Sequence, residues 1–171
     1  MAKLLIPEVL ELVSKAKTRK EKVAVLQKHN HPALKDIIRV ACDDDVVSLL
    51  PEGTPPYKKD DAPIGYSSST LYKTHKQFKY FFKGPIGNQV NPVRREGIFI
   101  GVLEMMHPSE SDLLCLAKDK KLDLDPEFYN SVFPGLIVKV HKPKAVKKAI
   151  GQDSSMRDSK KRVRKIRTAE K

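Results

Sequence analysis

This chain contains very little cysteine, tryptophan or glycine. Its 171 residues include two cysteines, eight glycines and no tryptophan. Cys42 and Cys115 are far apart and each lies within an apolar stretch, so the cysteines form neither a disulfide framework nor a metal-ligand spacing. The glycines form no phosphate-binding loop. We therefore expect both thiols to lie in the core of a protein that stays in a reducing compartment.

Long hydrophobic runs are also missing. The apolar stretch Leu4-Leu5-Ile6 near the start is far too short for the centre of a signal peptide. Nowhere do about 18 apolar residues follow one another, as a membrane-spanning helix would require. We expect a soluble, unexported protein of the cytoplasm that has no membrane partner.

The residue constellations that mark catalytic and metal sites are absent too. There is no strand-turn-helix nucleophile motif and no pair of histidines one helical turn apart around a glutamate. His29 and His31 could ligate a metal, and Asp43-Asp44-Asp45 could hold Mg²⁺ together with Asp60 and Asp61. Residues of these types are more often turn residues and solvated loop residues. We predict no metal, no cofactor and no enzymatic activity.

Charge is plentiful but unevenly distributed. Of the net charge of +12, residues 139–171 carry +10, because 13 of the 33 Lys and Arg but only three of the 21 Asp and Glu lie there. Apolar residues are too sparse in this stretch to offset its ordering entropy. We therefore predict one folded domain over residues 1–138, which should fold without the rest, and a disordered basic tail over residues 139–171. Such a tail favours a polyanionic partner, although it could simply keep the protein soluble.

Apolar residues recur with the helical period of 3.6 through most of the first 138 residues. Thr18 and Glu21 have the spacing of a capping box, and Asn91-Pro92 is a typical helix start. The expected helices lie at about 7–16, 19–28, 34–41, 69–83, 91–106, 108–117 and 126–133. Four prolines interrupt residues 43–68, which we expect to form one long loop. No alternating pattern indicates a strand, so the sequence predicts an all-α fold of about seven short helices.

Three clusters of basic residues are candidate nucleic-acid contacts. The first lies at the turn between the first two expected helices and comprises Lys17, Arg19, Lys20 and Lys22. The second lies on the 69–83 helix, opposite its apolar stripe and interleaved with Tyr72 and Tyr80, and comprises Lys73, Lys76, Lys79 and Lys83. The third lies in the tail and comprises Lys160, Lys161, Arg162, Arg164, Lys165 and Arg167. Basic residues interleaved with aromatics suit contacts with phosphate, sugar and base, yet each cluster could equally be ordinary solvated surface.

These elements together resemble the N-terminal, all-helical DNA-binding domain of ATP-dependent DNA ligases, especially those of bacteriophages. The similar segments are residues 17–26, residues 34–41, a leucine-rich helix near the far end, and the closing run Val132-Phe133-Pro134-Gly135-Leu136-Ile137. The resemblance spans nearly all of residues 4–138, and the closing run is its specific part. It implies a free-standing DNA-binding domain encoded by a phage. Such a protein would be located in the cytoplasm of the host cell.

The chain also departs from the ligase pattern. Ligases continue into a nucleotidyltransferase domain with a Lys-x-Asp-Gly motif, which does not occur here. Where ligases often have a small-residue loop near the minor groove, residues 118–125 include three aspartates that would repel phosphate. We therefore expect a non-catalytic accessory protein of phage DNA metabolism that contacts the phosphate backbone of DNA, or alternatively RNA, without base readout. The competing hypothesis is a module that docks on a replication or transcription protein.

Overall fold

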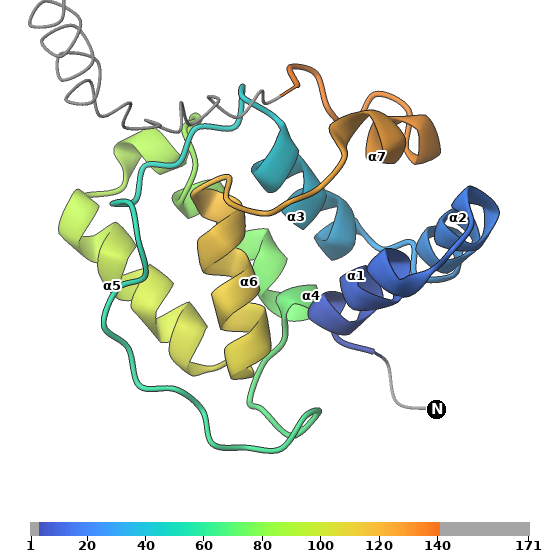
Figure 1. Ribbon diagram of the computed structural model, residues 1–171. Helices are drawn as coiled ribbons and strands as arrows, with labels where there is room; N and C mark the ends of the chain where they lie inside the picture. Colours follow the sequence, from blue (N-terminus) through green and yellow to red (C-terminus); the bar gives the residue numbers. More distant parts are fainter. Residues whose placement is uncertain (1–3, 141–171) are drawn as a thin grey trace, which may run out of the picture. The chain divides into compact units, whose positions relative to one another are not determined.

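The computed structural model describes residues 4–140, and this part of the chain is helical. Within it lie seven α-helices, two short 3₁₀ helices and no strand, only two isolated β-bridges (Figure 1). The elements are α1 (Ile6–Lys15), α2 (Arg19–Lys28), α3 (Pro32–Cys42), α4 (Leu71–Thr74), η1 (His75–Tyr80), η2 (Gly87–Gln89), α5 (Pro92–Glu104), α6 (Pro108–Lys118) and α7 (Pro126–Val132). The predicted all-α fold is confirmed. The predicted tail lies outside the described residues except for Lys139 and Val140.

Most helices begin within two residues of the starts that the sequence predicts. The Thr18 hydroxyl accepts a hydrogen bond from the backbone N–H of Glu21 at 3.2 Å, and the Glu21 carboxylate accepts one from the Thr18 N–H at 3.3 Å. This capping box satisfies two amides that the first turn of α2 leaves without intrahelical partners. At α7 the Asp125 carboxylate accepts from the N–H groups of Glu127 and Phe128. Proline stands in the first turn of α3, α5, α6 and α7, where its missing N–H costs nothing.

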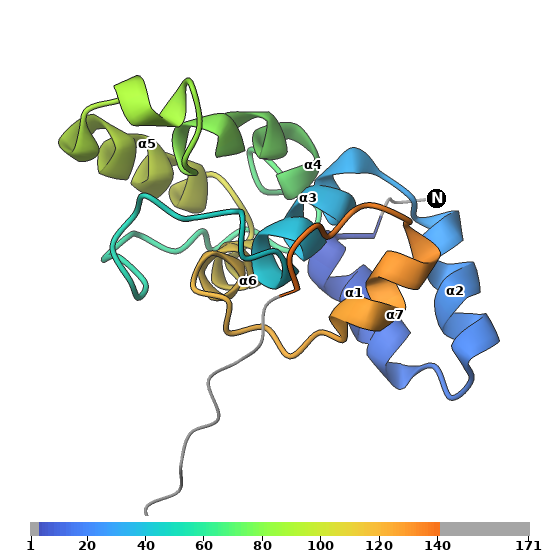
Figure 2. The same ribbon diagram turned by 90° about the horizontal axis from the view of Figure 1, so that it is seen from above.

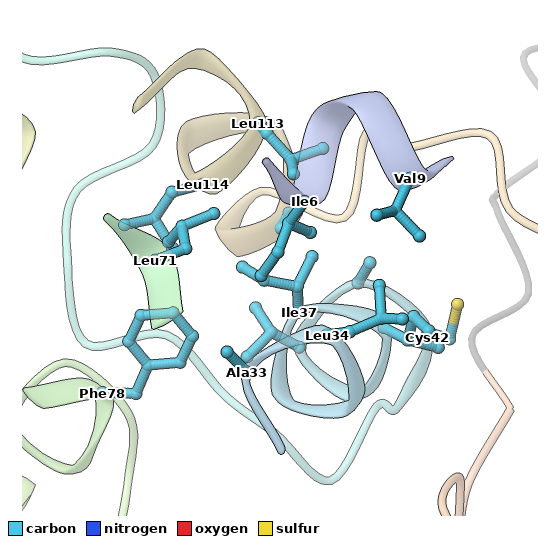
Figure 3. Close-up of a cluster of buried hydrophobic side chains, with 14 of the residues drawn as sticks. Ile6, Val9, Ala33, Leu34, Ile37, Cys42, Leu71, Phe78, Leu113 and Leu114 are labelled. Atoms are coloured by element: carbon cyan, nitrogen blue, oxygen red, sulfur yellow. The ribbon is translucent and has the colours of Figure 1, made fainter. Parts of the chain in front are cut away.

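Two central helices, α3 and α6, organise the core. Each is buried along most of its length, and α3 packs against α4 and α6, whereas α1 packs against α2 and α6. Figures 1 and 2 show α6 beside α3, with α5 and α1 on different sides of this pair. Figure 3 shows side chains that meet between these helices, including Ile6, Ile37, Leu71 and Leu114, none of them more than 1% exposed. Burying one such side chain stabilises the fold by about 1.5–3 kcal/mol. Tertiary packing therefore stabilises helices that are too short to persist alone.

The prediction of one α-helix over residues 69–83 was wrong. The segment forms a single α-turn, α4, which continues directly into the 3₁₀ helix η1 and ends at Tyr80. Beyond it, the carbonyl of Phe81 accepts from the N–H of Leu49 and the N–H of Lys83 donates to the carbonyl of Val47, both at 2.9 Å. These backbone groups are bonded to the long loop instead of to the next helical turn. The helical segment therefore ends at Tyr80, three residues before the predicted end at residue 83.

A buried carboxylate joins the end of α3 to the end of the described chain. Asp43 is 0% exposed and accepts hydrogen bonds from the backbone N–H groups of Asp45, Val138 and Lys139, each at 3.1 Å. Burial alone would raise the pKa of Asp43, but these donors and the nearby Arg39 guanidinium leave it below its ordinary value. The carboxylate is thus ionised at neutral pH, and Lys139, which the sequence assigned to the tail, is bonded to the helical body.

A chain that ends at Val138 should still fold but should be less stable than one that ends at Val140. The shorter chain loses the hydrogen bond from Lys139 N–H to Asp43 and the 2.8 Å bond from Asp44 N–H to the Lys139 carbonyl. Their loss should lower the free energy of unfolding by about 1–3 kcal/mol. Urea denaturation followed by circular dichroism would measure the difference, and coincident curves would contradict this account of Asp43.

A second buried carboxylate, Glu110 of α6, lies at the start of α4. Its side chain is 0% exposed; Oε2 accepts from the N–H of Leu71 at 3.2 Å, and Oε1 has no hydrogen-bond partner within residues 4–140. Burial raises the pKa of Glu110 from 4.5 to about 7, with the Leu71 and Ile6 amides acting in the opposite direction and the Glu8 carboxylate adding to the rise. The folded protein therefore holds a proton here at pH values where the unfolded chain has lost it.

The stability of the protein should consequently fall as the pH rises from about 4.5 to 7. Over this range the folded state binds more protons at Glu110 than the unfolded state does, so the free energy of unfolding has a negative slope against pH. The contribution amounts to about 2–3 kcal/mol. Glu110→Gln cannot titrate and should remove it. Denaturant curves for the wild-type protein and Glu110→Gln at pH 5 and pH 8 would test this prediction. If the difference in unfolding free energy between the two proteins is the same at both pH values, the prediction is wrong.

Candidate nucleic-acid interface

A groove of about 420 Å³ lies between α3, η1 and the turn that follows η1. We call it the η1 groove. It is lined by Asp36, Arg39, Val40, Val46, His75, Lys76, Phe78, Lys79, Phe82, Lys83, Gly84, Pro85 and Ile86. Three of the four lysines predicted for the second basic cluster are thus gathered at one concave surface, and the fourth, Lys73, is exposed one 3₁₀ turn before Lys76.

The edges of the η1 groove are positively charged. Arg39, Lys76, Lys79 and Lys83 are all exposed, and Nε of Arg39 forms an ion pair with the buried Asp43 carboxylate at 3.6 Å. Between residues 4 and 140 the three lysines form no ion pair. Among the described residues that line the groove, Asp36 is the single carboxylate, and its Oδ2 lies 2.8 Å from Nδ1 of His75. An anion that enters the groove therefore meets several cations and little repulsion.

The base of the η1 groove is apolar. Val40 of α3 and Phe78 of η1 are buried beneath it, and Val46 and Phe82 are half-buried. The rings of Phe78 and Phe82 meet edge to face with their centroids 6.0 Å apart. Ile86, at the lip, leaves 44% of its surface exposed. The groove thus combines cations along its edges with an uncovered apolar base.

Arg95 of α5 holds the wall of the η1 groove in place. The side chain is 6% exposed, and its guanidinium donates to the carbonyls of Leu49 and Tyr80 at 3.2 and 3.1 Å and to those of Gly87 and Val90 at 2.8 Å each. Tyr80 and Gly87 stand at the two ends of the turn that carries the groove lip. The planar five-donor group therefore fixes both ends of this turn and attaches them to the long loop.

Gly87 allows the chain to approach itself closely behind the same wall. A Cβ at this position would lie 2.1 Å from the Phe82 carbonyl oxygen and 3.1 Å from that of Lys79. Both neighbours are backbone atoms, which cannot move aside as a flexible side chain would. Only glycine fits where the turn folds back on the end of η1.

The first predicted basic cluster, at the turn between α1 and α2, lies close to several carboxylates. Lys17, Arg19 and Lys22 line a cleft of about 800 Å³ between α1, α2 and α7, to which Asp123, Asp125 and Glu127 also belong; we call it the corner cleft. Arg19 donates to the Ser131 hydroxyl at 2.9 Å, and its guanidinium carbon is 5.8 Å from the centre of the Phe128 ring. Lys20 is exposed but does not line the cleft. Three cations face three carboxylates, so the corner cleft has little net charge.

The other candidate residues have structural partners. The Tyr72 hydroxyl donates to the Leu4 carbonyl at 2.9 Å, and Tyr80 is half-buried with the Lys79 amine 5.2 Å from its ring centre. Both tyrosines therefore contact other parts of the protein and are not free side chains between the lysines. Asp119, one of the aspartates in the 118–125 segment, binds the N–H of Gly53 at 2.9 Å and the Lys118 amine. The six basic residues of the third cluster lie outside the described residues.

Two of the residues considered as metal ligands, His31 and Asp43, have structural partners. Nδ1 of His31 accepts from the N–H of Ala33 and caps α3, and the Asp43 carboxylate is occupied by backbone donors. In the part of the chain that the structure describes, no three histidine, cysteine or carboxylate side chains gather as a metal site would need. Nor does any helix between residues 4 and 140 have the length and apolar character to cross a membrane.

Sequence reasoning missed Arg39 and the apolar base of the η1 groove. Arg39 belongs to α3, Val46 to the long loop and Ile86 to the turn after η1, so no local pattern connects them. The available signal was a basic residue on the polar face of the 34–41 stripe, but nothing in the sequence indicates that this face turns toward η1.

A comparison with family models matches residues 9–124 to a model described as "Family of unknown function (DUF6433)". The matched range contains every residue that lines the η1 groove and ends before α7 and the closing run of the ligase resemblance. No curated protein matches the chain. The similarity to DNA ligases therefore stays a hypothesis.

Arg95→Lys should destabilise the protein even though it keeps the charge. A lysine ammonium has three donors on one nitrogen at the end of a flexible stem and cannot reach all four carbonyls at once, so some of these buried acceptors would lose their partner. The expected loss is about 2–4 kcal/mol. The neighbouring Arg94 is exposed, so Arg94→Lys is the matched control and should change stability by no more than about 0.5 kcal/mol. Equal unfolding midpoints for the two variants would contradict the role given to Arg95.

Proposed function

Because this chain belongs to a family whose function is unknown, DUF6433, we propose a function from the site itself. The protein is a non-catalytic nucleic-acid-binding protein that grips the phosphate backbone through the cations of the η1 groove. DNA is the expected partner, RNA the alternative, and the basic residues 139–171 add affinity without sequence readout. On the basis of the resemblance to phage ligase domains, we propose an accessory role in phage DNA metabolism.

The observation that supports this proposal is the separation of charge within the folded part. Arg39, Lys76, Lys79 and Lys83 surround one groove in which Asp36 is the single carboxylate among the described lining residues, although residues 1–138 as a whole carry only +2. Phosphates placed among these cations would displace condensed counterions, which is the main source of backbone affinity. The corner cleft has similar cations, but its three carboxylates would repel a phosphate that entered it.

The two cysteines are poorly suited to act as nucleophiles. Cys42 and Cys115 are each 3% exposed. Burial raises the pKa of Cys42 to about 11 and raises that of Cys115 as well, against the lowering effect of nearby amines. Both remain protonated thiols at neutral pH, and thiols are poor nucleophiles and metal ligands compared with thiolates.

The apolar base of the η1 groove supports a second candidate function, docking of a partner protein. Val46, Phe82 and Ile86 would offer such a partner a desolvated contact that responds weakly to salt. Backbone binding instead weakens linearly with the logarithm of the salt concentration. Salt dependence therefore separates the two functions.

Lys76→Glu combined with Lys83→Glu should weaken DNA binding by the full-length protein about tenfold or more at 0.1 M salt, because two phosphate contacts become repulsive. The slope of log affinity against log salt should become shallower by about 1.5–2. Fluorescence anisotropy with a labelled oligonucleotide would measure both quantities. Stability should change by no more than about 0.5 kcal/mol, since both positions are exposed.

The matched control is Lys17→Glu with Lys22→Glu, which changes the net charge equally but at the corner cleft. The control variant should lose clearly less DNA affinity than the groove variant. A control variant that loses as much affinity as the groove variant would remove the η1 groove as the binding surface. Normal DNA binding by both variants would also exclude the η1 groove as the binding surface, and would indicate that residues 139–171 supply the affinity.

A further inference from the structure

We propose that the η1 groove is built for single-stranded nucleic acid, with an unpaired base packed against Phe82 and Ile86 while the surrounding cations bind the flanking phosphates. This inference rests on the proposed function and narrows its substrate class. Backbone binding alone needs only cations, whereas the η1 groove also has a concave apolar base.

The first argument is the shape and chemistry of the groove. Its volume of about 420 Å³ falls within the range of sites that take small ring systems, about 300–1,000 Å³. Val40 and Phe78 seal it from below, and Phe82 and Ile86 leave apolar surface uncovered at its side and lip. A planar base could bury one face against these side chains. Each base has such a face, so the contact requires no particular sequence.

The second argument concerns what a duplex would place in the groove. In a double helix the base faces are hidden by stacking, and the outer surface consists of phosphates and sugars. A duplex phosphate pushed toward Phe82 and Ile86 would lose water without gaining a hydrogen bond from them, which is unfavourable. An unpaired strand avoids this cost because it can turn a base inward and leave its phosphates at the edges.

The third argument is the position of the cations. Arg39 belongs to the α3 wall, Lys76 and Lys79 to the η1 wall, and Lys83 to the turn that leads to the lip. Cations thus border the apolar base on both walls. This arrangement fits a single nucleic-acid strand whose phosphates contact the edges of the groove while one base enters the groove.

The groove is also preorganised. Arg95 bonds the carbonyls at both ends of the turn, and the Lys83 N–H donates to the Val47 carbonyl at 2.9 Å, so the lip is fixed before any ligand arrives. Little conformational entropy would be lost when a base enters a site of this kind.

The test compares strands that differ only in their bases. A labelled oligothymidine and an abasic strand of equal length have the same charge, so their affinities differ only through base contacts. The full-length protein should bind the oligothymidine about five- to tenfold more tightly at about 0.15 M salt. Ile86→Ser should bring the two affinities together and leave binding of the abasic strand unchanged. Val93→Ser removes a 79% exposed apolar side chain outside the groove and should have no effect.

The absence of tryptophan allows a direct spectroscopic readout. Ile86→Trp places a single indole at the lip, where stacking with a base should quench its fluorescence. We expect oligothymidine to quench it and the abasic strand to leave it unchanged, and Val93→Trp should respond to neither. Because Ile86 is 44% exposed, both Ile86 substitutions should leave the melting temperature nearly unchanged.

The outcomes separate the inference from the proposed function. Equal, salt-dependent binding of the oligothymidine and the abasic strand would overturn the inference and leave backbone binding intact. Tighter binding of a duplex of the same length would also overturn the inference alone. If no strand binds in a salt-dependent way, both proposals fail, and the apolar groove is then better explained as a protein-docking surface.

Discussion

A buried guanidinium needs hydrogen-bond acceptors for its donors, because an unsatisfied charge inside a protein costs several kcal/mol. Four of the five N–H donors of Arg95 are engaged by backbone carbonyls from the long loop, from the end of η1 and from the η2 region. Within residues 4–140 no carboxylate pairs with it. The position of α5 is therefore tied to segments that have little regular hydrogen bonding of their own. The groove exists because these irregular segments are anchored to a regular helix.

The regular part of the fold could be predicted from the sequence. Capping residues and prolines mark the starts of most helices, and the stripe Leu34, Ile37, Ile38 and Ala41 identifies α3 as a core helix. Local signals could not show that η1 tightens into a 3₁₀ helix and stops at Tyr80. That boundary depends on hydrogen bonds to Val47 and Leu49, more than 30 residues earlier in the chain. The spacing of apolar residues does not show whether a backbone group will bond to the next helical turn or to a distant segment of the chain.

The candidate site, too, could be predicted only in part from the sequence. The exposed lysines of the second cluster follow from their spacing along one segment, and the structure gathers three of them in the η1 groove. The sequence also marks the aspartates of residues 118–125 as unfavourable for phosphate. It does not show that Asp123 and Asp125 line the same cleft as Lys17 and Arg19, which are about 100 residues away. Net charge per segment is thus a poor guide to local potential, because the fold decides which charges neutralise one another.

The close approach at Gly87 has a consequence for recognising this groove in other proteins. The position needs a residue without a Cβ, and its carbonyl receives the guanidinium of the residue eight positions later. These two requirements are independent, one steric and one electrostatic, yet both depend on the same turn. A glycine followed at this spacing by an arginine in the first turn of the next helix therefore forms a compact fingerprint of the turn. In a sequence that keeps both residues the wall of the groove can be expected to form, whatever lysines surround it.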